Sequence, residues 1–236
     1  MEYEYKQFYR RNLPHMHTPG STLFVTFRLA GSIPQNVIKR WKAEKLWLDS
    51  EVRRLALLST AEGDNFDLLK EREITEFQRK WFRRFEEDLH HGTTGPHWLR
   101  IPEIAKILFD SLIERDGKVY KLHAFSIMSN HAHVVFTPKL DDRSLTEITR
   151  SNPLRFVSSK PTLGAIMQSL KGYTAHAANR VLGRTGSFWA AESYDRQIRK
   201  EGEFGRVINY VLNNPVKAGL VENWHDWKWN WRSATG

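Results

Sequence analysis

Two histidines separated by one residue, His131 and His133, lie within residues 124–137, a stretch whose apolar and β-branched residues predict β-strand on both sides of Ser129-Asn130. Residues i and i+2 of a strand point to the same face, so both imidazoles project toward one point. Two adjacent imidazoles on a rigid strand can hold a divalent metal ion. Taken alone, the spacing fits a structural pair without metal or a zinc site equally well.

A second signal lies near the C-terminus, where residues 201–214 predict an amphipathic helix. Tyr210 lies off the apolar stripe of this helix, on a face that it shares with Arg206 and Asn214 at i−4 and i+4. A core tyrosine is expected on the stripe, so Tyr210 is either a surface residue with a polar tip or a functional one. The stripe, at spacing i, i+3, i+4 and i+7, consists of Phe204, Val207, Ile208 and Val211.

Together the two signals indicate DNA strand chemistry. A tyrosine hydroxyl is a poor nucleophile until it loses its proton or its target becomes electrophilic. A metal held by His131 and His133 would polarise a scissile phosphate, and the amide oxygen of Asn214 could complete the ligand shell. Arg206 or Lys217 could offset charge on the phosphate oxygens. The expected product is a covalent 5′-phosphotyrosine with a free 3′-hydroxyl.

Two other tyrosines compete for the role of nucleophile. Tyr173 is expected in the middle of a helix near Lys171, and Tyr194 on a strand next to Asp195 and Arg196. Neither has an amide one turn further along its own helix. Tyr210 is therefore the favoured nucleophile.

The predicted elements place the histidines in the middle of a sheet. The order is strand, helices, strand, strand, helix, strand, helix, which predicts an α+β fold with a ferredoxin-like βαββαβ core and an antiparallel sheet. We expect one domain over 1–236, with a helical insertion at 35–95 in the first crossover and a Trp-rich tail at 220–236. The predicted strands are 22–29, 118–128, 131–138 and 188–198, and the predicted helices are 35–58, 68–89, 101–115, 163–182 and 201–214, the last stopped by Pro215.

Composition supports a nucleic-acid partner. The 236 residues carry a net charge of +9, and neutralisation of phosphates with counterion release drives the binding of such chains to DNA. The chain has no cysteine, which excludes a disulfide framework and a thiol nucleophile. No signal peptide or membrane span is visible, so a cytoplasmic location and no membrane partner are expected. Cations that flank the predicted site and could contact phosphates are Lys171, Arg180, Arg184, Arg196, Arg199 and Lys200.

Several segments resemble the single-tyrosine HUH transposases, and most closely their REP-associated tyrosine transposase branch, which is related to the IS200-like enzymes. The resemblance covers most of the chain apart from the helical segment around 40–95. It rests on Pro14-His15, Val25-Thr-Phe-Arg-Leu29, Met128-Ser-Asn-His-Ala-His133, Ser169-Leu-Lys-Gly-Tyr-Thr174, Phe188-Trp189 and Tyr210-Val-Leu-Asn-Asn-Pro-Val-Lys-Ala-Gly-Leu220. Ser129 departs from the proline that is usual in the Met-Pro-Asn-His turn of the family, without removing a ligand.

The resemblance implies specific roles. His131, His133 and Asn214 would be metal ligands, Tyr210 the nucleophile, and Mg²⁺ or Mn²⁺ the metal. The substrate would be single-stranded DNA, cleaved and rejoined near hairpins of repetitive extragenic palindromes by a monomer or a homodimer. Lys171, Arg196, Arg206 and Lys217 are the expected DNA contacts.

Alternatives remain open from the residues. The same fold could serve as a catalytically weak, domesticated repeat-DNA-binding protein, although such a binder has no need of the full set of site residues. A ferredoxin-like sheet also suits RNA recognition modules, but their aromatic signature on the central strands is missing. Trp227, Trp229 and Trp231 of the tail could stack on bases or pack on the core, and the other eight histidines are interpreted as surface residues.

Overall fold

A computed structural model of the chain describes residues 8–10, 14–16, 20–58, 76, 80, 82–89, 95–139, 162–199 and 202–234. The chain divides into two compact units, residues 31–96 and the remainder. None of the described helices is long and apolar enough to cross a bilayer. Predictions for 140–161 and for most of 59–81, including most of the second predicted helix, lie outside the described residues.

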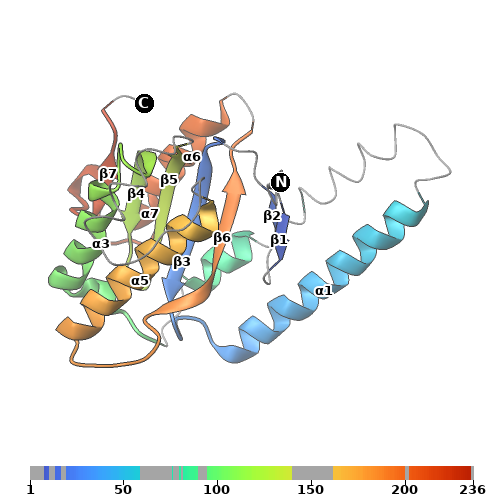
Figure 1. Ribbon diagram of the computed structural model, residues 1–236, viewed down its shortest axis with the longest axis horizontal. Coiled ribbons are helices and arrows are strands. Elements are labelled where there is room, and N and C mark those ends of the chain that lie inside the picture. Colours follow the sequence, from blue (N-terminus) through green and yellow to red (C-terminus); the bar gives the residue numbers. More distant parts are fainter. Residues whose placement is uncertain are drawn as a thin grey trace, which may run out of the picture. The chain divides into compact units, whose positions relative to one another are not determined.

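The larger unit contains a five-stranded antiparallel sheet (Figure 1). Its strand order is β6-β3-β5-β4-β7, so the four strands of the predicted core have the 4-1-3-2 order of a ferredoxin-like βαββαβ unit. The predicted α+β fold class is confirmed. The bounds are β3 Leu23–Leu29, β4 Tyr120–Ile127, β5 His131–Pro138, β6 Trp189–Gln197 and β7 Asn230–Arg232, with β1 Phe8–Arg10 and β2 Pro14–Met16 in a separate two-stranded sheet.

One face of the sheet is packed against helices α3 (Pro102–Glu114) and α5 (Leu163–Val181), which lie side by side (Figure 1). Strand alternation explains this, because every second residue of β3 and β5 is apolar and buried in one core with these helices. On β3 these are Leu23, Val25, Phe27 and Leu29, and on β5 they are Ala132, Val134 and Phe136. The histidines of β5 alternate with the core residues and therefore lie on the other face.

Helix α6 (Glu203–Leu212) contacts β4 and β5 and covers that other face. Its buried stripe keeps Val207, Ile208 and Val211 of the predicted one, while Leu212 is buried and Phe204 is only partly so. The helix does not run to Asn214 as predicted but ends at Leu212, with Asn213 as C-cap. Pro215 lies in the first turn of the short helix α7 (Asn214–Lys217), where its missing N–H costs nothing. The break therefore precedes the proline.

The C-terminal segment packs tryptophans against the sheet and leaves each of them partly exposed. The chain has two 3₁₀ turns, η2 (Trp98–Arg100) before α3 and η3 (Trp224–Asp226) before β7. Strand β7 pairs with β4, and the ring of Trp231 stacks on that of Phe125 with 5.9 Å between the ring centroids. The indole N–H of Trp227 donates to the carbonyl of Ile127 at 3.1 Å. The packing interpretation of the tail is the one that fits these contacts.

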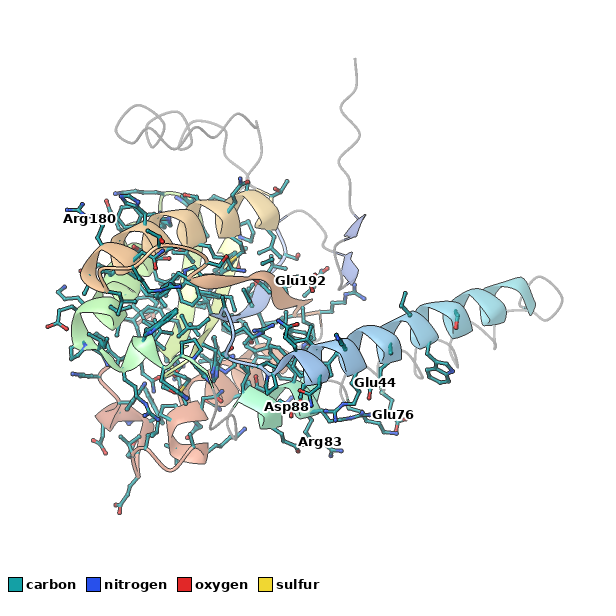
Figure 2. The ribbon with its side chains drawn as sticks, turned by 90° about the horizontal axis from the view of Figure 1, so that it is seen from below. Glu44, Glu76, Arg83, Asp88, Arg180 and Glu192 are labelled. Atoms are coloured by element: carbon teal, nitrogen blue, oxygen red, sulfur yellow. The ribbon has the colours of Figure 1, made fainter. Side chains whose placement is uncertain are left out.

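The smaller unit contains helix α1 (Gln35–Leu58) and a helical segment at 82–89. The rings of Trp41 and Phe85 lie 5.3 Å apart, and Arg84 and Glu44 form an ion pair at 2.9 Å. Charged side chains of both signs line these helices (Figure 2). At the ends of the unit Gly95, with a φ of 103°, approaches Gly31 so closely that a Cβ would collide with the Gly31 carbonyl oxygen.

Candidate active site

The face of the sheet beneath α6 carries a row of polar and aromatic side chains. Thr26 of β3 lies between His133 on β5 and Tyr194 on β6 in the strand register. His131, His133 and Thr26 are all buried, with exposed fractions of 1%, 0% and 0%. Buried polar side chains are normally hydrogen-bonded, and these are.

The Nε2 atoms of the two predicted metal ligands lie 3.1 Å apart and share a hydrogen bond, in which His131 accepts because its Nδ1 carries the proton. The Nδ1 atom of each ring has a hydrogen-bond partner of its own. Nδ1 of His131 donates to Oδ1 of Asn130 at 2.6 Å, and Nδ1 of His133 lies 2.8 Å from the hydroxyl of Thr26. His131, which donates through Nδ1, presents the lone pair of Nε2, which is the arrangement that metal-binding histidines adopt.

Tyr210 lies against this pair. Its ring centroid is 5.9 Å from that of His133 and 5.9 Å from that of Phe24, with edge-on geometry in both contacts. Phe24 in turn stacks on His133 at 5.7 Å. Tyr210 is partly exposed, whereas the histidines are buried. The tyrosine ring is therefore open to solvent beside the buried histidines.

Asn214 is fully buried at the start of α7, and its Nδ2 donates to the carbonyl of Tyr210 at 3.1 Å. Its Oδ1 is buried without a hydrogen-bond partner among the described residues. Burying an unpaired amide oxygen is costly unless something else satisfies it, and a cation would do so. Among the residues that the structure describes, no cluster of three or more His, Cys, Asp or Glu is found. Imidazole nitrogens and an amide oxygen are donor types that divalent metals accept, so His131, His133 and Asn214 are the residues that would hold one.

The four cations expected to contact DNA have different environments. The ammonium of Lys217 lies 4.3 Å from the centroid of the Tyr210 ring, so it belongs to the site. Arg206 is exposed and its guanidinium lies next to Gly202, toward the end of α6 away from Asn214. Arg196 forms an ion pair with Glu203, and Lys171 donates to the carbonyl of Ala190 at 3.0 Å on the α5 face of the sheet.

The two rival nucleophiles are separated by the sheet. Tyr173 is 40% exposed on α5, with the guanidinium of Arg115 5.7 Å from its ring, so it lies on the side opposite to the histidines. Tyr194 is on the histidine side, 6.1 Å from Phe24 by ring centroids, but is only 9% exposed. Of the two, Tyr194 is the rival that requires an experimental test.

Sequence reasoning missed three residues of the site. Thr26 and Asn130 hold the imidazoles and Phe24 packs between His133 and the tyrosines, yet none was assigned a role. The sequence did carry one signal for Thr26: polar Thr26 and Arg28 alternate with apolar residues along β3, which puts both on the face away from the core. One histidine expected at the surface is buried instead, since His123 is 8% exposed at a bulge of β4.

No protein-family model matches the chain, and no curated protein matches it. Among solved structures the chain is similar to one described as "Structure of the REP associates tyrosine transposase bound to a REP hairpin". The identity is 12%, the match covers 94% of this chain and 80% of that chain, and the TM-score is 0.45.

Proposed function

We propose that the chain is a metal-dependent single-stranded DNA endonuclease and strand transferase that works through a covalent 5′-phosphotyrosine at Tyr210. Its substrate would be DNA next to REP-type hairpins, as the sequence resemblance implies. The observation that carries the proposal is the meeting of three groups: converging Nε2 atoms of His131 and His133, and the ring of Tyr210 against His133.

The reaction is a transesterification at phosphorus. The hydroxyl oxygen of Tyr210 forms a bond to the scissile phosphorus, the bond to the 3′ oxygen breaks, and that oxygen leaves as a 3′-hydroxyl with a proton. The phenolic proton passes to solvent, to which Tyr210 is open. The reverse attack by a 3′-hydroxyl releases the tyrosine and rejoins the strand, so no external energy source is needed.

The residues around Tyr210 orient it and balance charge. The Lys217 ammonium above the ring offsets negative charge that develops on the phosphate and on the tyrosine oxygen. The Asn214 bond to the carbonyl of Tyr210 ties the last turn of α6 to α7. A Mg²⁺ or Mn²⁺ ion held by His131, His133 and Asn214 would supply the positive charge that polarises the phosphate.

The test is adduct formation with a 5′-labelled and an internally labelled hairpin oligonucleotide that has single-stranded flanks. We expect a denaturation-resistant protein–DNA adduct in Mn²⁺ or Mg²⁺, none in EDTA, and none with Tyr210→Phe. Tyr194→Phe and Tyr173→Phe are the matched controls and are expected to keep the adduct. An adduct that persists in Tyr210→Phe and disappears in Tyr194→Phe would show that Tyr194 on β6, and not Tyr210, is the nucleophile.

The same assay separates the enzyme from a domesticated repeat-DNA-binding protein. A binder would retain the hairpin in a filter or anisotropy assay in EDTA and would give no adduct with any metal. The orphaned, fully buried Oδ1 of Asn214 favours the enzyme, because a binder gains nothing from that cost.

A further inference from the structure

Strand β7 of the Trp-rich tail presents different residues to the two faces of the sheet. Trp231 stacks on Phe125, and the ring of Trp229 lies edge-on to that of Phe109 on α3, with 6.3 Å between the ring centroids. Both tryptophans therefore pack on the α3 face. Asn230 lies between them in the sequence, so strand alternation directs its side chain to the histidine face, which α6 covers.

The amide of Asn230 joins β7 to the end of α6. Its Nδ2 donates to the carbonyl of Leu212 at 2.9 Å and to the carbonyl of Trp224 in η3 at 2.9 Å. Both partners are acceptors, so the amide fits only with its NH₂ group toward them. Its Oδ1 is then buried without a hydrogen-bond partner among the described residues. An apolar side chain of similar size would avoid that cost, so the two donated bonds are what Asn230 contributes here.

The carbonyl that Asn230 holds belongs to Leu212, the last residue of α6, which follows closely after Tyr210. Carbonyls of the last helical turn have no regular partner within the helix and need one from elsewhere. In the same turn, Asn214 of α7 donates to the carbonyl of Tyr210 at 3.1 Å. The turn that carries Tyr210 is therefore held by β7 and by α7 together.

The strand register connects this anchor to the predicted metal ligand His133. Asn230 is paired with Ser126 on β4, and Ser126 is paired with His133 on β5. The three residues form one row across the sheet, on the face that α6 covers. Backbone hydrogen bonds fix the positions within the row, because neighbouring strands lie at a constant spacing. The bond from Asn230 to Leu212 therefore fixes the end of α6 relative to His133.

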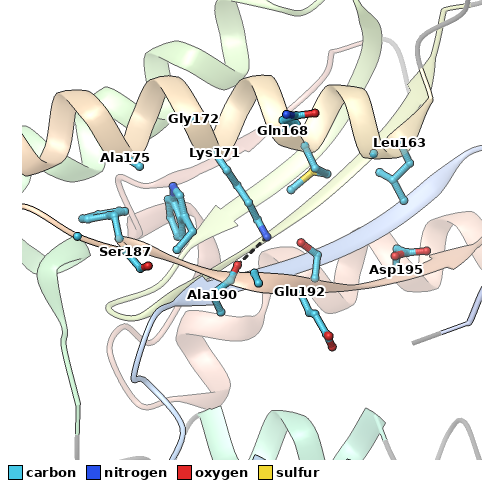
Figure 3. A pocket seen from close by; sticks show the side chains of 16 residues that line it. Leu163, Gln168, Lys171, Gly172, Ala175, Ser187, Ala190, Glu192 and Asp195 are labelled. Atoms are coloured by element: carbon cyan, nitrogen blue, oxygen red, sulfur yellow. Dashed lines mark hydrogen bonds between the residues drawn. The ribbon is translucent and has the colours of Figure 1, made fainter. Parts of the chain in front are cut away.

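Helix α5 on the opposite face is tied to the edge strand β6 in a looser way. A cleft of about 450 Å³ lies between them, with Gly164 and Gly172 among the residues that line it. Lys171 reaches across this cleft and donates to the carbonyl of Ala190 (Figure 3). A lysine side chain is long and has many rotamers, so it fixes a helix less rigidly than a short asparagine does. The more rigid link belongs to the helix that carries Tyr210.

We propose that Asn230 is a positioning residue of the candidate active site: by holding the last turn of α6 to the row that carries His133, it sets the position of the Tyr210 hydroxyl. The inference rests on the proposed function, since this position matters only when Tyr210 attacks a phosphate beside a metal ion. Asn230 acts through the carbonyl of Leu212 and not on the reacting atoms. The Trp-rich tail thereby contributes to the reaction through the helix of the nucleophile.

Asn230→Leu tests the proposal, because it removes both donors at a similar side-chain size. Trp227→Phe is the matched control. It removes a hydrogen bond of the same segment, at 3.1 Å, whose acceptor is Ile127 of β4 and not a residue of α6. For each protein we would measure the free energy of unfolding, the affinity for the hairpin in EDTA, and the single-turnover rate of adduct formation in saturating Mn²⁺. The rates are compared at a temperature at which every variant is folded.

We expect Asn230→Leu to lower the adduct rate about 10- to 100-fold, as a misplacement of up to about 1 Å does. Its hairpin affinity should equal that of the wild type, because binding in EDTA does not depend on where the tyrosine hydroxyl lies. Trp227→Phe should be less stable and keep the wild-type rate. A wild-type rate in folded Asn230→Leu would overturn the proposal. Equal rate losses in the two variants would also overturn it, since they would indicate a general loosening of the fold.

A second measurement reports the position of the tyrosine itself. With fluorotyrosine at position 210, Mn²⁺ held by His131 and His133 should broaden the fluorine NMR signal by an amount that falls steeply with distance. We expect this broadening to differ from the wild-type value in Asn230→Leu and to be unchanged in Trp227→Phe. If Asn230 only stabilised the fold, the broadening would be unchanged in both variants, which would contradict the assignment.

Failure of the proposed function is distinguishable from failure of this inference. If the wild type forms no adduct in Mn²⁺ or Mg²⁺, the proposed function fails and the inference with it. If the wild type forms the adduct and folded Asn230→Leu forms it as fast, only the inference fails. Should Asn230→Leu not fold, Asn230→Ser carries the test, because a hydroxyl donates one hydrogen bond and not two. It should lower the adduct rate, and a wild-type rate would contradict the assignment.

Discussion

At the level of single residues, the hydroxyl of Thr26 holds the ring of His133 in its orientation through Nδ1. It is buried, 2.8 Å from Nδ1 of His133, and faces no solvent that could replace it. Thr26→Val removes the hydroxyl at nearly constant volume and leaves Nδ1 without its partner, so we expect Mn²⁺ affinity to fall about 10- to 100-fold. Isothermal titration with Mn²⁺ measures this, and Thr26→Ser should restore most of the affinity. Wild-type Mn²⁺ affinity in Thr26→Val would show that the hydroxyl is only structural.

The same residue shows where sequence reasoning ends. The spacing of His131 and His133 is local, so strand alternation was enough to predict that the side chains converge. Thr26 reaches His133 across 107 residues of chain, and only the register between β3 and β5 brings them together. Alternation with the buried Leu23, Val25 and Phe27 fixes the face of Thr26, but a slip of two residues would keep that face and place another residue beside His133, and the local pattern does not distinguish these registers.

At the level of elements, His123 links the bulge of β4 to the first turn of α6. Its ring lies edge-on to Phe204 at 5.0 Å, and its Nε2 is 2.8 Å from the hydroxyl of Thr137. Burial lowers the pKa of His123 below its ordinary value of 6.5, the charge of Lys121 lowers it further, and Asp116 opposes the shift. The ring is therefore neutral in the folded protein at neutral pH.

This shift predicts a stability loss in acid. As pH falls through 6.5, the unfolded chain protonates this histidine before the folded protein does, so the free energy of unfolding decreases. Urea unfolding of the wild type at pH 7.5 and 5.5 measures the loss. His123→Gln keeps a donor for Thr137 but does not titrate, so its loss over the same interval should be smaller. An equal loss in both proteins would assign the pH dependence to other groups.

Strand β7 offers a second test, because its tryptophans could serve the fold or the DNA. Trp231 stacks on buried Phe125 and is itself partly exposed. Trp231→Ala should therefore cost about 2 kcal/mol of unfolding free energy, less than the 3–5 kcal/mol of a fully buried tryptophan. Hairpin affinity of the folded variant should stay unchanged. A loss of affinity without a loss of stability would restore the base-stacking interpretation of the tail.

Element boundaries illustrate what local patterns can and cannot predict. Strand β5 and helix α1 match the predicted ranges, since long apolar runs and helical periodicity are strong local signals. The end of α6 was misplaced because Pro215 was interpreted as the stop, whereas the chain stops the helix at Asn213 and uses the proline to start α7. Asn214 therefore begins α7 instead of ending α6, so the error concerned a residue of the candidate site.

At the level of the whole molecule, the charge is unevenly divided between the two units. Residues 31–96 contain 12 Lys and Arg and 12 Asp and Glu, so they carry no net charge. The entire excess of +9 lies in the unit that contains the candidate site and the cleft. Because phosphate attraction follows net charge, that unit alone has the composition of a DNA-binding body.

This partition predicts how salt weakens DNA binding. Each phosphate neutralised by a cation contributes about −0.9 to the slope of log affinity against log salt concentration for duplex DNA and about −0.7 for a single strand. Lys217→Gln, beside Tyr210, should reduce the magnitude of the slope by roughly 0.7. Lys80→Gln in the neutral unit is the matched control, since Lys80 is exposed and forms a local ion pair with Glu76 at 3.0 Å. Its slope should equal that of the wild type. Fluorescence anisotropy of a labelled hairpin between about 50 and 300 mM NaCl gives the slopes. If Lys80→Gln reduced the slope as much as Lys217→Gln, DNA would contact both units despite their different net charges.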